Sequence, residues 1–584
     1  MKVQLAFACL VLLAVPAGAQ HTTLPEPPGA VMISEPEDDL RARLQDELPR
    51  LLQKAEIPGI SISVIRDGQL YWTGTAGMAN LSEPALVTAD TVFQAASLSK
   101  PVFAYLVLKL SDRGLIDLDK PLATYLPYPR LEHDERYRKI TARMILSHTS
   151  GLPNWALGQD HIPFQFSPAE AWGYSGEGYV YLQKVVEKLT GSTLPELARK
   201  EVFEPFGMVR SSFVWDSEIS SAAAVGVNEL GGVERINSRG EANAAASLLT
   251  TARDYGRFLV ALLAGRGLKP ETREAMFKPQ AQVPSKWGEP NSPKQAGVFW
   301  GLGWGLEQAR GEETLWHWGH QDAWRAYVAV RRDGRSGVVY FTNGSEGLSI
   351  AQALSDLVIG GPRPGLDWLN YEQYDDPKRF ARKEMERALA QSTEAGLRRY
   401  RELRASSPQV ADSAFVRNLA DRLLERNQEA QAVALLRAAL VDEPRSAELN
   451  GALGQALTGT GELQLALLAY ETATRLNPEK QWPVMRKWLQ EGIDANPVEL
   501  PEEQLIRLAG SYGPRQITAE GGRLYYQREG RPRYRLIPVS PTLFQVEGNG
   551  SFRVRFAEDA SKLTVIQPDG EDESARINAN PPRP

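Results

Sequence analysis

The 584-residue chain has almost no cysteine, because its only one, Cys9, lies in the first apolar stretch. Residues 1–19 combine a positive charge at Lys2, an apolar run over Leu5–Val15 and the small residues Ala17-Gly18-Ala19. That pattern is typical of a cleaved secretory signal peptide. We therefore expect a periplasmic or secreted chain that has no cysteine once processed, which excludes disulfides and thiol catalysis.

The chain also lacks a second long apolar run and a strong charge of one sign. The first run is too short to act as a permanent membrane span, so no such span is expected. The formal net charge is only −6, with acids and bases interspersed, which argues against nucleic acid as a partner. None of the six histidines has the His-Glu-x-x-His spacing of a zinc hydrolase, so neither a metal nor another cofactor is expected.

The chain does contain patterns typical of two β-hairpins, with a long segment of helical and strand-like stretches between them. Residues 20–37 are rich in proline and acids and are expected to form a flexible tail, followed by an amphipathic helix over 38–54. A hairpin is expected over 60–72 and a second over 326–341, each around an Asp-Gly turn. With helices between them, these strands predict an α+β domain over 38–360 whose terminal strands complete one sheet.

Two further domains follow a Gly/Pro-rich boundary at 360–365. Residues 366–496 are helical in pattern, and Pro444 and Pro478 mark a 34-residue period that resembles the tetratricopeptide repeat. Such an array would offer a concave face to a protein partner, the alternative being a plain helical linker. Short alternating runs over 497–570 predict a small antiparallel β-domain, and the polar residues 571–584 a disordered tail.

The strongest chemical signal is Ser97-Leu98-Ser99-Lys100, which opens an apolar, helix-like stretch. Helix positions three apart share a face, so the hydroxyl of Ser97 and the amine of Lys100 are expected to meet. A partly desolvated lysine can take the proton of a serine, and a helix N-terminus favours developing negative charge. A single copy of this short pattern is common by chance, and then means only a solvated serine and lysine.

Further motifs follow in a fixed order. They are Leu146–Pro153, which contains His148; Trp172–Tyr179, which contains Tyr174; Leu248–Tyr255; Gly301–Trp304; and His317-Trp318-Gly319-His320. Together with Ser97–Lys100, over roughly residues 37–355, this set resembles the serine β-lactamase-like superfamily. The resemblance is to class C β-lactamases, their penicillin-binding relatives and the esterases of the same fold.

The resemblance implies a role for each matching residue. Ser97 would be the acylated nucleophile, Lys100 would relay its proton, and Tyr174 would be a second acid/base group, as a phenolate held by the lysine. The backbone N–H groups of Ser97 and His320 would form the oxyanion hole. The residues expected to line the substrate site are His317, Gly319 and Gly176.

Two departures from the family pattern bear on the substrate. Gly176 stands where the family's Tyr-x-Asn motif has an asparagine that binds the substrate amide, and His317 stands where β-lactamases have a lysine. Both favour an esterase or amide hydrolase over a β-lactamase. His148 is expected to brace its loop by hydrogen bonding. The tryptophans at 300, 304, 316, 318 and 324 are expected either to line the floor of a substrate cleft or to fill a hydrophobic core.

The sequence thus predicts a multidomain, exported serine hydrolase. It would act through an acyl-enzyme at Ser97 on a small ester, amide or D-amino-acid peptide. The competing hypothesis is a non-catalytic protein, in which the hydrolase fold is a ligand receptor and the helical repeats bind a protein partner.

Overall fold

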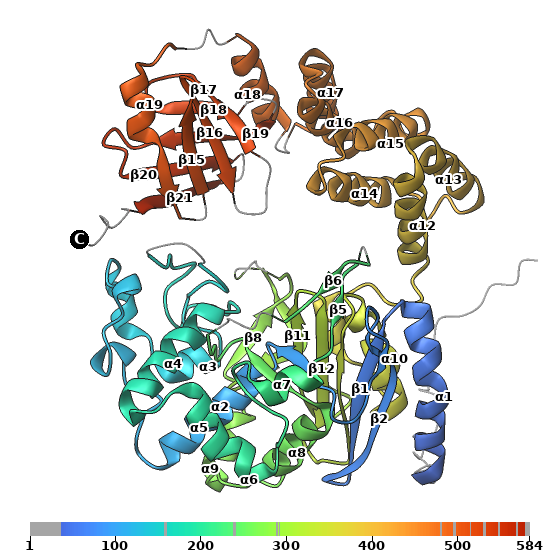
Figure 1. The fold of residues 1–584 in the computed structure, drawn as a ribbon, viewed down its shortest axis with the longest axis vertical. Coiled ribbons are helices and arrows are strands. Elements are labelled where there is room, and N and C mark those ends of the chain that lie inside the picture. The colour runs from blue at the N-terminus through green and yellow to red at the C-terminus, as the bar shows by residue number, and fades with distance from the viewer. Residues whose placement is uncertain are drawn as a thin grey trace, which may run out of the picture.

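The computed structural model describes residues 37–156, 161–229, 231–236, 241–287, 290, 292–478, 482–494, 498–513, 515–528, 533–546, 549–567 and 570–577. The expected signal peptide and nearly all of the expected tail over 20–37 lie outside these residues. Figure 1 shows three parts: a large N-terminal domain of helices and strands, a helical segment, and a β-barrel, the last two on the same side of the first.

The N-terminal domain is built on a nine-stranded antiparallel sheet with the order β3-β2-β1-β13-β12-β11-β10-β9-β8. These strands are β1 (Gly59–Arg66), β2 (Gln69–Asn80), β3 (Ala85–Leu86), β8 (Ala281–Pro284), β9 (Lys294–Trp300), β10 (Gly305–Ala309), β11 (Glu312–Gln321), β12 (Trp324–Arg331) and β13 (Ser336–Thr342). β1 pairs with β13, with Val64 opposite Val338. The predicted closure of the sheet by its terminal strands is therefore confirmed.

Helices cover both faces of this sheet. Successive strand residues point to opposite faces, so Val328 and Val330 join the core that contains α2 (Ser99–Asp112) and α8 (Ala252–Leu263). Tyr327 and Ala329 join the other core, with α1 (Glu37–Ala55) and α10 (Ala351–Val358). The central strands β12 and β13 are buried on both faces and are largely apolar.

Most of the remaining elements of this domain are short. The helices are α3 (Ala142–Leu146), α4 (Gly176–Thr190), α5 (Leu194–Ala198), α6 (Glu204–Phe206), α7 (Ser217–Ala222), α9 (Pro270–Met276) and α11 (Pro364–Leu369), with single turns at 122–124, 129–131, 135–139, 199–203 and 347–350. Two small sheets pair β4 (Phe93–Ala96) with β7 (Leu248–Thr250), and β5 (Gly226–Val227) with β6 (Val233–Glu234). Leu366 and Trp368 of α11 lie in the domain's core, so this helix packs with the sheet rather than with the helices that follow it.

The helical segment consists of hairpin pairs that share one core. Its helices are α12 (Pro377–Gln391), α13 (Thr393–Ser406), α14 (Ser413–Glu425), α15 (Glu429–Asp442), α16 (Ala447–Thr460), α17 (Leu463–Leu476) and α18 (Trp482–Asp494). α14 and α16 begin at residues 413 and 447, and α15 and α17 at 429 and 463, which is 34 residues apart in both cases. The tetratricopeptide-like character of the segment remains a prediction.

The first helix of the segment is anchored on the N-terminal domain. Arg379 is fully buried and donates hydrogen bonds to the carbonyl of Ala55, at 2.6 Å, and to the carboxylate of Glu346, at 3.2 Å. One turn later, Lys383 forms ion pairs with Glu56 and Glu346. These contacts hold α12 at the end of α1.

The C-terminal part is a closed antiparallel barrel in the order β14 to β21, preceded by α19 (Glu502–Leu508). Its strands are β14 (Gly510–Tyr512), β15 (Arg515–Glu520), β16 (Arg523–Arg528), β17 (Arg533–Pro538), β18 (Leu543–Val546), β19 (Asn549–Phe556), β20 (Lys562–Gln567) and β21 (Gly570–Ile577). Residues 571–577, expected to be a disordered tail, instead form most of β21. Pairing with β14 and β20 closes the barrel and removes two free edges, which the polar sequence of β21 does not reveal.

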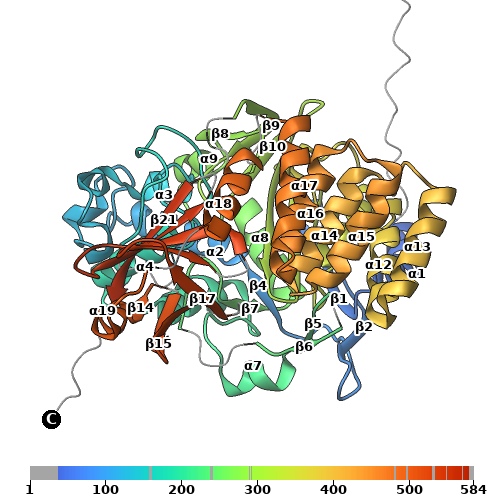
Figure 2. The same cartoon turned by 90° about the horizontal axis from the view of Figure 1, so that it is seen from above.

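Figure 2 shows the barrel beside the helical segment, both above the N-terminal domain. Arg553 of β19 donates a hydrogen bond to Glu491 of α18 at 2.6 Å, so the two parts are in contact. Within the described residues, no helix combines the length and apolar character needed to cross a membrane.

Candidate active site

Ser97 lies in the turn between β4 and α2. The preceding residue, Ala96, has a φ of +50°, a left-handed conformation that is unusual for a residue with a side chain. The hydroxyl of Ser99 donates to the carbonyl of Ala96 at 2.6 Å and accepts from the N–H of Leu248 at 2.9 Å. Ser99 is fully buried, so these bonds tie the strained turn to β7. The sequence analysis did not single out Ser99.

Lys100 reaches back from the first turn of α2 to Ser97, which precedes the helix. Its Nζ lies 3.1 Å from the Ser97 Oγ and 2.9 Å from the carbonyl oxygen of Ala245. The lysine is fully buried while Ser97 is partly exposed. Burial lowers the pKa of Lys100 well below its ordinary value. The amine therefore loses its proton more readily than an ordinary lysine, and in its neutral form it can accept the proton of the serine.

Tyr174 is held beside these two residues by His148. The carbonyl of His148 accepts from the N–H of Gly173 at 2.8 Å, and its Nδ1 accepts from the N–H of Ser175 at 3.1 Å. The two bonds fix the backbone on both sides of Tyr174, and the imidazole ring lies 4.3 Å from the tyrosine ring. The predicted bracing role of His148 is confirmed.

Tyr174 is a neutral phenol rather than the expected phenolate. Burial raises its pKa, and the neighbouring Ser97 side chain lowers it by a smaller amount. Lys100 Nζ lies 4.6 Å from the centre of the tyrosine ring, but the burial of the amine disfavours the positive charge that would hold an anion. Among the described residues, no group makes a hydrogen bond of normal geometry with the Tyr174 hydroxyl.

The motif His317–His320 lies on β11, which passes close to the Ser97 turn. A Cβ on Gly319 would lie 2.4 Å from the carbonyl oxygen of Ala95, so only glycine permits this approach. Gly319 thus serves the packing of β11 against β4, and it places His320 next along the strand. The oxyanion hole formed by the N–H groups of Ser97 and His320 remains a prediction.

The His317 ring is buried and neutral. Its Nδ1 donates to the carbonyl of Trp318 at 2.9 Å, which leaves Nε2 as an acceptor. Burial lowers the pKa of His317 to about 3. Within the described part of the chain, its Nε2 is buried and has no hydrogen-bond partner.

Gly176 is the first residue of α4, and an indole ring occupies the space beside it. A Cβ at this position would lie 2.7 Å from the Trp155 ring and 2.8 Å from the carbonyl oxygen of Asn154. The family asparagine is therefore replaced by a glycine and an aromatic neighbour. Sequence analysis found Gly176 but not Trp155, which lies in a loop between two motifs.

The clustered tryptophans belong to the core. The rings at 300, 304, 316, 318 and 324 are all buried, which decides between the two alternatives left open by the sequence. Two other aromatic residues reach the site instead. Trp287 is 49% exposed, with its ring 5.5 Å from that of Tyr174, and the hydroxyl of Tyr371 lies 2.8 Å from Nδ1 of His320. Tyr371 follows α11, in a region that the sequence assigned to the helical repeats.

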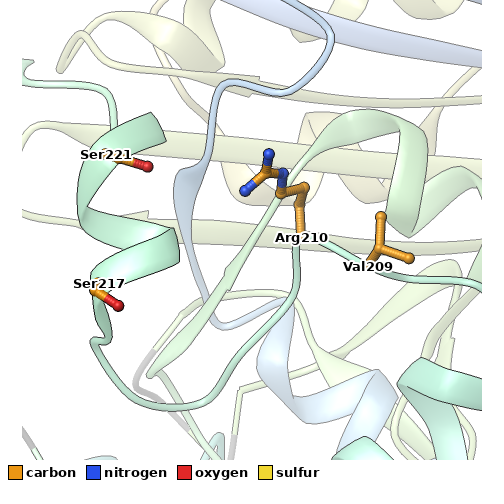
Figure 3. Close-up of a pocket in the computed structure, with 4 residues that line it drawn as sticks. All are labelled: Val209, Arg210, Ser217 and Ser221. Carbon is orange, nitrogen blue, oxygen red and sulfur yellow. The ribbon is translucent and has the colours of Figure 1, made fainter.

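Other candidate sites add nothing to this constellation. The described residues contain no group of three or more histidine, cysteine or acidic side chains arranged for a metal ion. A surface pocket of about 470 Å³ is lined by Val209, Arg210, Ser217 and Ser221, and includes none of the predicted catalytic residues (Figure 3).

The sequence was next compared with known proteins. Penicillin-binding protein 4* of Bacillus subtilis (strain 168) is 24% identical over 389 residues, covering 59% of this chain and 79% of that protein. Protein flp of Staphylococcus aureus (strain MRSA252) is 21% identical over 327 residues, covering 52% of this chain and 63% of that protein.

Two solved structures also match the chain at low identity. The octameric penicillin-binding protein homologue from Pyrococcus abyssi is 17% identical, covers 90% of this chain and 98% of its own, and has a TM-score of 0.46. D-alanine carboxypeptidase AmpC from Burkholderia cenocepacia is 20% identical, covers 54% and 98%, and has a TM-score of 0.45.

A family model described as Beta-lactamase matches residues 44–359, which is more than half of the chain. The matched region contains Ser97, Lys100, Tyr174 and the strand that carries His317, all of which the fold places around one site. The chain belongs to the beta-lactamase family.

Proposed function

We propose that the protein is a serine hydrolase that forms an acyl-enzyme at Ser97 and acts on a small ester, amide or D-amino-acid peptide. The observation that carries this proposal is the buried amine of Lys100, 3.1 Å from the hydroxyl of a partly exposed serine. A neutral amine at hydrogen-bond distance is what a serine needs to become a nucleophile.

The geometry supports a simple acylation step. Ser97 Oγ attacks the carbonyl carbon of the substrate as Lys100 Nζ takes the hydroxyl proton, and the carbonyl electron pair moves to oxygen. The backbone N–H groups of Ser97 and His320 would donate hydrogen bonds to that oxyanion. Each such donor typically lowers the barrier by about 3–4 kcal/mol. The proton then passes from Lys100 to the leaving group, and the bond between the carbonyl carbon and the leaving group breaks. Tyr174, whose phenol lies next to Ser97, would be the second acid/base group in this transfer.

Deacylation repeats the same chemistry with water. Lys100, neutral again after the leaving group departs, takes a proton from a water molecule that attacks the acyl carbon. The Ser97 oxygen recovers the proton as the ester bond breaks. No cofactor is needed to balance either half of the reaction.

An active-site probe tests this proposal. A fluorophosphonate should label the purified full chain, and the substitution Ser97→Ala should abolish the labelling. A fluorescent penicillin is a useful second probe, since a relative is named as a penicillin-binding protein. Equal labelling of the wild type and Ser97→Ala, or no labelling of the wild type, would favour the non-catalytic receptor.

The helical segment and the expected export belong to this proposal as well. The segment would recruit a protein partner while the N-terminal domain carries the chemistry. A pull-down comparing the full chain with a chain lacking residues 377–494 tests the partner, and detection of the processed chain outside the cytoplasm tests export. Retention of the same proteins by both chains would reduce the segment to a spacer.

A further inference from the structure

Trp155 is an exposed indole on a loop whose backbone is held in place. It is 37% exposed. The preceding carbonyl, of Asn154, accepts from the N–H of Gly176 at 3.0 Å, and the following N–H, of Ala156, donates to Glu177 at 2.8 Å. Arg130 also pairs with Glu177 at 2.9 Å. Hydrogen bonds therefore hold the backbone on both sides of Trp155, which fixes the point from which its ring projects.

This ring replaces a polar group at the substrate site. It occupies the space next to Gly176, where the family resemblance places an asparagine side chain. A substrate that reaches this position meets the face or edge of an indole instead of an amide. Hydrogen bonding to a substrate amide is thus exchanged for apolar contact.

Trp287 is a second exposed tryptophan, and its ring lies beside that of Tyr174. It is 49% exposed, although its ring packs 5.5 Å from the rings of Tyr174 and Trp318 and 5.2 Å from that of Trp368. Trp368 is itself fixed by a 2.7 Å bond from its Nε1 to the carbonyl of Pro284. A held indole that leaves half of its surface in water is typical of a binding site.

The ionisable groups nearest to Ser97 do not favour a charged substrate. Burial lowers the pKa values of Lys100, His148 and His317, which disfavours the charged form of each. The same burial disfavours pairing of these residues with a substrate carboxylate, whereas an uncharged ring would find two indoles.

We propose that Trp155 and Trp287 form an apolar subsite beside Tyr174 that selects substrates with an uncharged aromatic acyl group. The proposal rests on the proposed function, because the acyl group in question is the one transferred to Ser97. It names Trp155 as the residue that determines specificity in place of the family asparagine.

Three 4-nitrophenyl esters with the same leaving group test the subsite on the full chain: the phenylacetate, the acetate and the hemisuccinate. The wild type should have its highest kcat/KM, relative to spontaneous hydrolysis, on the phenylacetate and its lowest on the negatively charged hemisuccinate. Trp155→Ala and Trp287→Ala should each lower the ratio of kcat/KM on the phenylacetate to kcat/KM on the acetate about tenfold, equivalent to about 1.4 kcal/mol.

Trp72→Ala is the matched control, because Trp72 is a partly exposed tryptophan of β2, and Figure 1 shows β2 on the opposite side of the domain from α4. It should leave the ratio of the two rates unchanged. A wild type that prefers the hemisuccinate, or a phenylacetate-to-acetate ratio that both tryptophan variants retain, would overturn the subsite while leaving the hydrolase intact. Failure of the proposed hydrolase function would give a different result, because Ser97→Ala would then hydrolyse the acetate as fast as the wild type.

Discussion

Replacing Ser99 with alanine removes two buried hydrogen bonds from the turn that carries Ser97. The carbonyl of Ala96 and the N–H of Leu248 would both lose their partner in a fully buried environment. An unsatisfied buried group costs about 1–3 kcal/mol, so the loss of both partners should lower the free energy of unfolding by about 2–6 kcal/mol. Urea unfolding followed by the fluorescence of the buried tryptophans measures this change.

The same substitution should slow acylation. Ala96 has a left-handed φ of +50° and is held there in part by the Ser99 hydroxyl. Without that bond the turn can relax, and Ser97 moves relative to the Lys100 amine. Fluorophosphonate labelling should become at least tenfold slower, since a displacement of about 1 Å in a reacting group can cost about a hundredfold.

Ser61→Ala is the control for both effects. Ser61 is equally buried, on β1, but its hydroxyl has no hydrogen-bond partner among the described residues. Its loss should change the free energy of unfolding by less than about 0.5 kcal/mol, because no hydrogen bond is broken. Equal destabilisation by Ser99→Ala and Ser61→Ala, or unchanged labelling of Ser99→Ala, would refute the reasoning.

Four further predictions concern other contacts of the N-terminal domain. Gly319→Ala should abolish labelling of the folded protein, because its Cβ would lie 2.4 Å from the Ala95 carbonyl oxygen. Arg363→Ala should lower the free energy of unfolding by about 3–5 kcal/mol, since it removes the ion-pair partner of Glu307, whose side chain is 2% exposed. Lys100→Arg should slow labelling at least about a hundredfold, because arginine stays protonated and cannot act as the base. Wild-type labelling should rise with pH as Lys100 loses its proton, with a midpoint well below the ordinary lysine pKa.

Each of these predictions has its own check. Arg335→Ala removes an ion pair whose arginine side chain is 75% exposed, so the loss should stay below about 1 kcal/mol. A labelling rate that does not vary with pH, or that survives Lys100→Arg, would remove the amine from the mechanism. The lowered pKa of Lys100 also means that the unfolded chain binds more protons, so native stability should rise with pH up to about pH 10.4.

Local patterns in the sequence were sufficient where the structure depends on neighbours along the chain. Alternating residues around Asp-Gly turns predicted both hairpins, because strand period and turn chemistry are local properties. Ser97 and Lys100 are only three positions apart, so their meeting required little more than the turn into a helix. The order of the motifs also led to the family, and hence to Tyr174 and His317.

The tertiary structure alone decided what depends on residues far apart in sequence. The protonation states of Lys100, Tyr174 and His317 follow from burial, which no local pattern reveals. The approach of β11 to β4 at Gly319 and the indole of Trp155 beside Gly176 are contacts between distant segments, as is the closure of the barrel by β21. The sequence by itself therefore determined the hairpins, the family and a candidate nucleophile, while packing decided the closure of the barrel, the environment of the site and the surface that meets the substrate.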